Sequence, residues 1–154
     1  MNNTFRIRVG VVLKRDNRIL IVRMHRDKGD LFVLPGGGLE QGEGIFECAQ
    51  REVKEEANLD VDIIKVLYLK DLISDIENSF EVIVLGKILR GNPVKGIDPE
   101  DKGKNVLKEV QWVNVDKLKN INFHPKQLKE TLPISFKNNF KQDITYLGKF
   151  QYPE

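Results

Sequence analysis

The run GGGLEQGEGIFECAQREVKEEANL, residues 36–59, decides how this chain folds. It opens with three glycines and holds six glutamates in 24 residues. On an α-helix, Glu52, Glu55 and Glu56 would lie at i, i+3 and i+4 and would therefore share one face. Like charges this close destabilise an isolated helix by about a few tenths of a kcal/mol per pair. An interaction in the folded protein must therefore offset this repulsion.

Two interpretations account for this acidic face. A solvated surface helix is the simpler one, and for REVKEE alone we favour it. A hard divalent cation would instead turn the repulsion into binding, because Mg²⁺ and Ca²⁺ prefer carboxylate oxygens. Arg51 lies four residues before Glu55 and beside Glu52, so it can hold one carboxylate while the others bind a metal. The glycines at 36–38 would let the backbone approach an ion or a phosphate closely, although a plain glycine turn also fits.

The spacing of the whole stretch resembles the Nudix box, G-x5-E-x7-R-E-U-x-E-E-x-G-U, where U is a bulky aliphatic residue. The matching residues are Gly37, Glu43, Arg51, Glu52, Val53, Glu55, Glu56 and Leu59. At ordinary residue frequencies, such a match arises by chance less than about one time in a million. Asn58 replaces the last glycine of the box. Asn is the commonest substitute for Gly in the left-handed residue that ends a helix, so we expect the turn to be kept.

This resemblance implies an α/β fold, the Nudix-type α/β/α sandwich, in which a mixed β-sheet carries the loop–helix–loop of the box over about residues 5–132. Family members mostly hydrolyse the phosphoanhydride bond of a nucleoside diphosphate linked to another group. Carried over by position, Arg51 and Glu43 would shape the loop–helix–loop, and Gly37 and Gly38 would lie at the substrate. The implied ligands for Mg²⁺ or Mn²⁺ are Glu52, Glu55, Glu56 and the backbone carbonyl of Gly36 or Gly37.

Hydrolysis of a diphosphate also needs a carboxylate that accepts a proton from the attacking water. In relatives this base is a box glutamate or one on a later loop, before a strand with an aromatic residue. Glu109, three residues before Trp112, is the downstream candidate that fits best. An ordinary surface acid is the competing interpretation. The further candidates are Glu100, Asp101 and Glu81.

Basic residues cluster shortly before the glycines, where Arg23, His25, Arg26 and Lys28 follow one another closely. Arg23 and Arg26 are candidates to clamp the phosphates of the substrate, because a guanidinium matches phosphate oxygens in a bidentate way. The end of a soluble hairpin explains the cluster equally well. His25 and His124 show no spacing typical of zinc ligands, and the single cysteine, Cys48, fits a small buried thiol.

The rest of the chain reads as strands with few helices, which favours an α/β or α+β architecture. Apolar alternation predicts a hairpin of residues 6–14 and 18–24 around Asp16-Asn17, and a short strand at 31–34. Phe46, Ala49 and Val53 form an apolar stripe that predicts a helix over 45–57. Further strands are predicted at 61–69, 80–89 and 110–113, short helices at 116–120 and 125–131, and a long loop at 91–105.

Length and composition indicate one domain over residues 1–154. With 25 basic and 23 acidic residues the net charge is +2, so charge alone gives no reason to expect duplex nucleic acid as a partner. No apolar run approaches the length of about 20 that spans a bilayer, and the opening residues lack the apolar core of a signal peptide. One cysteine excludes an internal disulfide and fits a reducing cytosol. We therefore expect a cytoplasmic protein.

The segment Pro133–Glu154 carries five aromatic residues and few acids. We expect this C-terminal tail to fold back as a lid or a strand, or to pack across a homodimer. In the dimer version, truncation after Leu132 changes the oligomeric state.

The expected activity is Mg²⁺-dependent hydrolysis of a small nucleotide substrate. A non-catalytic nucleotide-sensing module is the main alternative, and a phosphorylated-isoprenoid isomerase would need a cysteine outside the box, where none exists. In the family, a proline or tyrosine some 15–17 residues after the box is typical of ADP-ribose and dinucleoside polyphosphate enzymes. KDLISDIEN, residues 70–78, has neither. Nucleoside triphosphates, nucleotide sugars and RNA 5′ ends stay open.

Overall fold

The computed structural model describes residues 4–93 and 108–151. Their strands form a mixed sheet in the order β8-β3-β2-β1-β6-β5-β9, with β4 paired to β1 and β7 paired to β2. The strands are β1 (Thr4–Arg15), β2 (Arg18–Met24), β3 (Leu31–Val33), β4 (Gly36–Gly38), β5 (Asp60–Ile73), β6 (Glu77–Arg90), β7 (Lys108–Asn114), β8 (Phe123–His124) and β9 (Thr145–Gln151). The helices are α1 (Ile45–Ala57), the 3₁₀-helix η2 (Val115–Asn120) and α2 (Leu128–Lys137).

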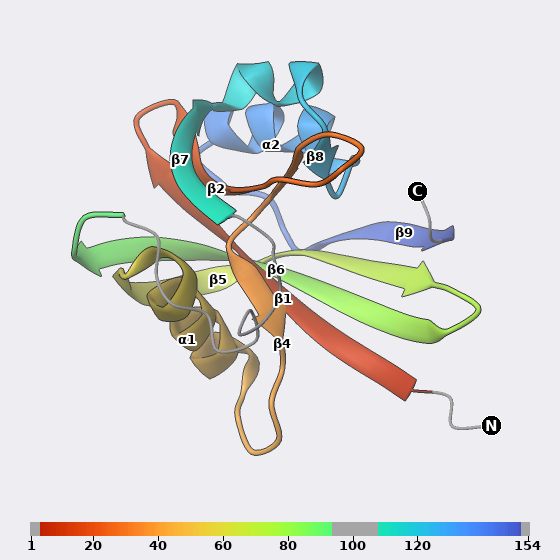
Figure 1. The fold of residues 1–154 in the computed structure, drawn as a ribbon. Helices are drawn as coiled ribbons and strands as arrows, with labels where there is room; N and C mark the ends of the chain where they lie inside the picture. The colour runs from red at the N-terminus through yellow and green to blue at the C-terminus, as the bar shows by residue number, and fades with distance from the viewer. Residues whose placement is uncertain (1–3, 94–107, 152–154) are drawn as a thin grey trace.

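Strand β1 organises the sheet because different parts of it pair with different strands (Figure 1). Residues 4–13 run parallel to β6, and the opposite edge of β1 pairs antiparallel with β4 at Arg8–Gly10 and with β2 at Lys14–Arg15. The predicted hairpin between β1 and β2 is confirmed, with Asp16 in the left-handed conformation at φ 53°. Because β4 and β2 pair with different parts of β1, the sheet divides into two arms. One arm contains β2, β3, β7 and β8, and the other contains β4, β5, β6 and β9.

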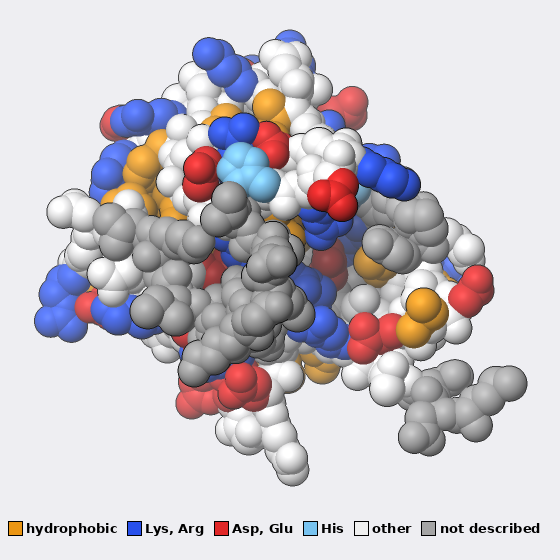
Figure 2. Space-filling model, viewed as in Figure 1, with side chains coloured by type: hydrophobic (Ala, Val, Ile, Leu, Met, Phe, Trp, Pro, Cys, Tyr) orange, Lys and Arg blue, Asp and Glu red, His pale blue; other side chains and the backbone are white. Residues whose placement is uncertain are grey.

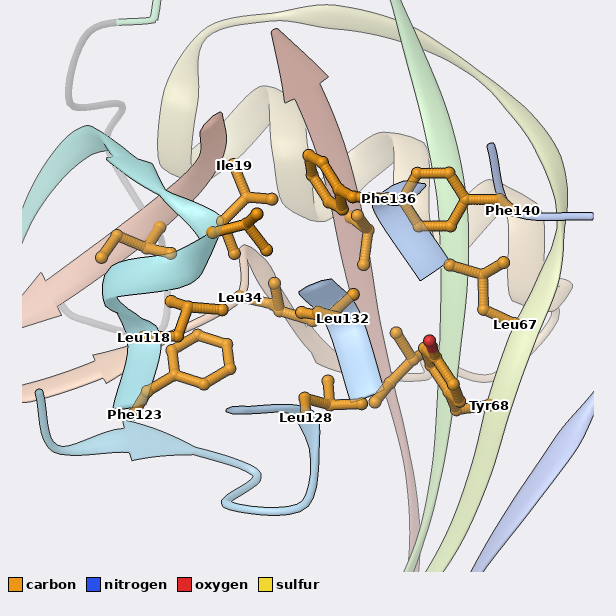
Figure 3. Close-up of a cluster of buried hydrophobic side chains, with 14 residues drawn as sticks. Ile19, Leu34, Leu67, Tyr68, Leu118, Phe123, Leu128, Leu132, Phe136 and Phe140 are labelled. Atoms are coloured by element: carbon orange, nitrogen blue, oxygen red, sulfur yellow. The ribbon is translucent and has the colours of Figure 1, made fainter. Parts of the chain in front are cut away.

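Helices cover both faces of the sheet, so the predicted α/β/α sandwich is confirmed (Figure 1). Alternation along the strands sends successive side chains to opposite faces. In β1, Val12 joins the cluster that includes Leu128 and Phe136 of α2, whereas Val11 and Leu13 join the one that contains α1. Figure 3 shows the α2 cluster, where Leu132 and Phe136 of α2 face Ile19 of β2 and Leu34, which follows β3.

Helix α1 has the predicted bounds, but the prediction that Phe46 belongs to its buried apolar stripe is wrong. Phe46 is 43% exposed, while Ala49 and Val53 are buried together with Cys48 and Ala57. Helical spacing gives the direction of a side chain and not whether the sheet extends far enough to cover it. Phe46 lies in the first turn, where its ring stays in contact with solvent.

The C-terminal third differs from the prediction in its helix and in its tail. The predicted helix at 125–131 is in fact α2, which begins at Leu128 and continues through Pro133 to Lys137. The segment after Pro133 therefore starts as helix, and its later part is β9, an edge strand parallel to β5. A fold-back strand is the arrangement found, and a dimer contact stays a prediction.

The remaining expectations agree with the structure except in their bounds. The strands predicted at 61–69, 80–89 and 110–113 are extended to 60–73, 77–90 and 108–114. Most of the predicted loop at 91–105 lies outside the described residues. Acidic and basic side chains are interspersed on the face shown in Figure 2, in keeping with the balanced charge. No helix in the described ranges is long and apolar enough to cross a membrane.

Candidate active site

Both ends of α1 are fixed by the residues that flank it. At the start, the Gly44 backbone N–H donates to the Glu47 carboxylate at 2.7 Å, which satisfies a donor that the helix leaves unpaired. At the end, Asn58 adopts the left-handed conformation, with φ 55° and ψ 37°, and its N–H donates to the Lys54 carbonyl at 3.0 Å. The turn expected from Asn in place of Gly is confirmed.

Arg51 is the centre of the acidic cluster. Its Nε and Nη2 donate to both oxygens of Glu43 at 3.0 and 2.7 Å, and Nη2 also donates to the Gly38 carbonyl at 3.0 Å. Its Nη1 lies 2.9 Å from Glu52 Oε1 and 3.2 Å from Glu55 Oε2. One guanidinium thus ties the loop after β4 to α1 and compensates for the repulsion between neighbouring carboxylates.

The charges of this cluster stabilise one another. Hydrogen bonds from Arg51 lower the pKa of Glu43 from 4.5 to about 2, against burial, which raises it, and the Glu40 backbone N–H adds to the decrease. Hydrogen bonding to Glu43 in turn raises the pKa of Arg51. Both groups therefore stay ionised across the neutral range.

The glycine strand lies directly against the carboxylates. A Cβ at Gly37 would stand 2.3 Å from Glu52 Oε1, and one at Gly36 would stand 2.0 Å from the Val9 carbonyl oxygen. The Gly36 N–H donates to Glu56 Oε1 at 3.2 Å. Glycine is required here because β4 is clamped between β1 and the glutamates. Close approach of the backbone at residues 36–38 was predicted from the sequence, but a strand there was not.

Glu52 and Glu56 are buried, at 1% and 8% exposure, and Glu55 is partly exposed. Buried carboxylates beside glycine backbone form a set of oxygen donors, and hard divalent cations prefer such donors. Within the described residues no three acidic, histidine or cysteine side chains already converge on one ion position. In this arrangement Arg51 lies between Glu52 and Glu55.

Cys48 is fully buried on the sheet-facing side of α1, as its sequence context predicted. Its Sγ donates to the Gly38 carbonyl at 3.6 Å. Burial, followed by the negative charge of Glu43, raises the pKa of this thiol to about 12. The thiol is therefore protonated near neutral pH and packs as a small apolar group.

The four basic residues before the glycines divide into two groups. Arg23 donates to Asp30 Oδ2 at 2.9 and 2.6 Å, and His25 Nδ1 lies 2.8 Å from Asp30 Oδ1. The hydrogen bond from Arg23 is the main cause that lowers the pKa of Asp30. Glu109, on the neighbouring strand β7, lies 3.6 Å from both Arg23 Nη1 and His25 Nε2. These side chains form one ion-pair cluster at the end of β2.

Arg26 and Lys28 instead line a cavity of about 670 Å³. The cavity lies between the two arms of the sheet, with Gly10 and Ile83 on one side and Leu34 on the other. Gly36 also lines it, so the cavity adjoins the glycine strand at the residue whose N–H bonds Glu56. Trp112 does not line it and packs against the α1 core. Of the further base candidates, Glu81 lines the cavity, and Glu100 and Asp101 lie outside the described residues.

Solved structures share this fold over most of the chain. A NUDIX hydrolase from Nitrosomonas europaea has a TM-score of 0.72 at 21% identity, and the match covers 98% of this chain and 81% of that one. A UDP-X diphosphatase has a TM-score of 0.70 at 18% identity, with 94% and 68% covered. At these identities the likeness establishes the fold.

The family model of the NUDIX domain matches residues 4–133, and the chain therefore belongs to the Nudix family. The NAD-capped RNA hydrolase NudC of Vibrio atlanticus (strain LGP32) is 40% identical over 55 residues, which cover 36% of this chain and 20% of the relative. An ADP-ribose pyrophosphatase of Methanocaldococcus jannaschii is 40% identical over 55 residues, with 34% and 32% covered. These matches thus span a fifth to a third of the curated relatives' length.

Proposed function

We propose that this protein is a divalent-metal-dependent diphosphohydrolase that cleaves a phosphoanhydride bond in a nucleoside diphosphate linked to another group. The observation that carries the proposal is the position of Glu52, Glu55 and Glu56 on α1. Arg51 bonds the first two, and the Gly36 N–H of the glycine strand bonds the third. Arg51 offsets part of the repulsion among these carboxylates, and a bound cation would offset more of it. All the acidic residues of the family's box are present.

The residues of α1 would hold Mg²⁺ or Mn²⁺ through the carboxylates of Glu52, Glu55 and Glu56, with the Gly36 carbonyl as a further ligand. When bound, the metal supplies charge neutralisation for the diphosphate and lowers the pKa of the attacking water. Arg51 positions Glu52 and Glu55 through Nη1, the Gly36 N–H donates to Glu56, and Glu43 fixes Arg51 through two hydrogen bonds.

A carboxylate must accept the proton of the attacking water, and we propose Glu109 for this step. Glu109 lies 3.6 Å from Arg23 Nη1 and from His25 Nε2, and Arg23 remains a candidate to bind phosphate. Glu109→Gln should lower turnover at least about tenfold, because an amide does not accept the proton. A fold check by thermal unfolding accompanies this variant, and unchanged turnover would exclude Glu109 as the base.

The names of the two relatives concern NAD-capped RNA and ADP-ribose, both of which contain a diphosphate link. Residues 70–78 lack the proline and tyrosine typical of ADP-ribose enzymes, which weighs against that substrate here. We therefore propose a small nucleotide or a capped or triphosphorylated RNA end as the substrate. A cytoplasmic location and a homodimer remain predictions.

The test is a hydrolysis panel of nucleoside triphosphates, dinucleotides, nucleotide sugars and capped RNA, with Mg²⁺ or Mn²⁺ and with a chelator. A double variant, Glu55→Gln with Glu56→Gln, should lower kcat/KM by at least about 100-fold and weaken metal binding. Glu130→Gln, an exposed acid on α2, serves as the matched control. Undiminished turnover and metal affinity in the double variant would refute the proposal.

The products also distinguish the classes of reaction. Pyrophosphate with a nucleoside monophosphate indicates cleavage of a triphosphate, and two monophosphates indicate cleavage of a diphosphate link. Metal binding with no turnover on the whole panel would favour a nucleotide-sensing module, the second candidate.

A further inference from the structure

The cavity beside the glycine strand has the size and lining of a nucleoside site. Its volume of about 670 Å³ lies within the range of small-molecule pockets. Leu34, Ile83 and Leu72 line it with apolar surface, which suits the faces of a planar base. Arg26 and Lys28 add positive charge from the loop after β2.

A row of charged residues crosses the sheet along one side of this cavity. Gly38 on β4 pairs with Arg8 on β1, Arg8 with Glu81 on β6, and Glu81 with Lys70 on β5. Register partners on neighbouring strands point to the same face. Arg8, Glu81 and Lys70 all line the cavity. With strands about 4.8 Å apart, the Lys70 backbone lies about 14 Å from Gly38, at the far end from the acidic cluster.

Lys70 is an unusual residue for this place, because lysine is almost never fully buried. Its exposure is 2%, and its Nζ lies 5.1 Å from the ring centroid of Phe150. Phe150 belongs to β9, which lies beyond residues 4–133, the part that matches the NUDIX domain. An ammonium over an aromatic ring is attracted to it. Strand β9 thus covers Lys70 from one side and helps to keep it at the cavity.

We infer that Lys70 and Glu81 are specificity-determining residues that bind the polar edge of the substrate's nucleobase, and that this base is guanine. The inference rests on the proposed function for the presence of a nucleotide, and it adds the identity of the base. The diphosphate would lie at the acidic cluster, and the base would lie at the far end of the cavity.

The chemistry of the two side chains selects guanine among the bases. An ammonium only donates hydrogen bonds, and an ionised carboxylate only accepts them. Guanine presents a carbonyl oxygen next to two N–H groups, so Lys70 can donate to the oxygen while Glu81 accepts from both N–H groups. Adenine, cytosine and uracil offer no such pair of adjacent donors beside a carbonyl. Charge-assisted and bidentate hydrogen bonds are the strong ones.

Arg8 completes the arrangement as a positioning residue. Its Nε lies 3.9 Å from Glu81 Oε1, an ion pair that favours one orientation of the carboxylate. The Glu81 side chain is 19% exposed, so it is accessible from the cavity. The pair is long enough to leave the carboxylate oxygens able to accept further hydrogen bonds.

The experiment measures binding of GMP, IMP and AMP by calorimetry to the full chain and to Lys70→Met and Glu81→Gln. IMP lacks the 2-amino group of GMP, so it isolates one of the two N–H contacts. We expect GMP to bind at least about tenfold more tightly than AMP, with IMP between them. Each variant should reduce GMP affinity at least about tenfold and remove the preference over AMP.

Lys149→Met is the matched control. Lys149 lies beside Phe150 on β9, pairs with Asp71 and is exposed, so its loss removes the same charge from the other face of the strand. This variant should bind GMP as the unchanged protein does. Thermal unfolding checks that each variant is folded, and Glu81→Gln keeps the side-chain shape should Lys70→Met disturb packing.

Equal affinity of the unchanged protein for the three nucleotides, absence of GMP binding, or a GMP preference that persists in both variants would overturn the inference. Since binding of monophosphates needs no turnover, the result is independent of the hydrolysis panel. A protein that binds GMP selectively and hydrolyses nothing would contradict the proposed function and support this inference. An active hydrolase with no preference among bases would support the proposed function and contradict this inference.

Discussion

Replacing Glu43 with glutamine tests whether Arg51 holds the acidic helix in the way described. Glu43 accepts two hydrogen bonds from Arg51, at 3.0 and 2.7 Å, and its side chain is 15% exposed. Glutamine keeps the shape and removes the charge. Arg51 would retain its bonds to Glu52, Glu55 and the Gly38 carbonyl, and the longer ion pair with Glu40 at 3.7 Å.

The lowered pKa of Glu43 sets the size of the effect. Each pKa unit corresponds to about 1.4 kcal/mol, so a pKa reduced from 4.5 to about 2 limits the stabilisation by ionised Glu43 to about 3 kcal/mol. Water and the glutamine amide replace part of the lost interaction. We therefore expect the free energy of unfolding to fall by about 1–2 kcal/mol near neutral pH, which lowers the melting temperature by roughly 3–8 °C.

The effect should depend on pH with a definite sign. Because the folded-state pKa of Glu43 lies below its ordinary value, the stabilisation is complete above pH 4.5 and is lost as the pH falls toward about 2. The gap between the unchanged protein and Glu43→Gln should be constant above pH 4.5 and should narrow below it.

Urea unfolding, followed by the fluorescence of Trp112, the only tryptophan, measures this gap at each pH. Glu130→Gln is the control, since Glu130 is exposed, and we expect a change below about 0.5 kcal/mol. Equal stability of Glu43→Gln and the unchanged protein near neutral pH, or a stability difference that does not narrow in acid, would show that ionised Glu43 does not stabilise the fold through Arg51.

Two further substitutions test other contacts. Gly37→Ala places a Cβ 2.3 Å from Glu52 Oε1, so we expect at least about a tenfold loss of metal affinity, measured by calorimetry, whereas Gly44→Ala, whose Cβ lies 3.7 Å from Glu47 Oε2, should keep it. Tyr68→Phe removes hydroxyl bonds to Ser135 and Gln142 in the α2 core, so the free energy of unfolding should fall by about 1–2 kcal/mol. An unchanged urea midpoint would show that this hydroxyl contributes nothing.

Local spacing was sufficient for much of the box. The helix at 45–57, its left-handed end at Asn58 and the burial of Cys48 follow from interactions within a few residues. Phe46 shows the limit of such reasoning, because its exposure depends on where the sheet ends. The start of α2 at Leu128 and its passage through Pro133 likewise depend on packing against the sheet.

Residue spacing along the chain was enough to predict the family, the acidic face of α1 and the contact of Arg51 with it, because the box lies within residues 37–59. Only the tertiary structure brought together Arg8, Lys70 and Glu81, divided the basic residues at 23–28 between an ion-pair cluster and a cavity, and added β9 to the sheet. Strand register joins residues far apart in the chain through backbone hydrogen bonds, which every non-proline residue can make whatever its side chain.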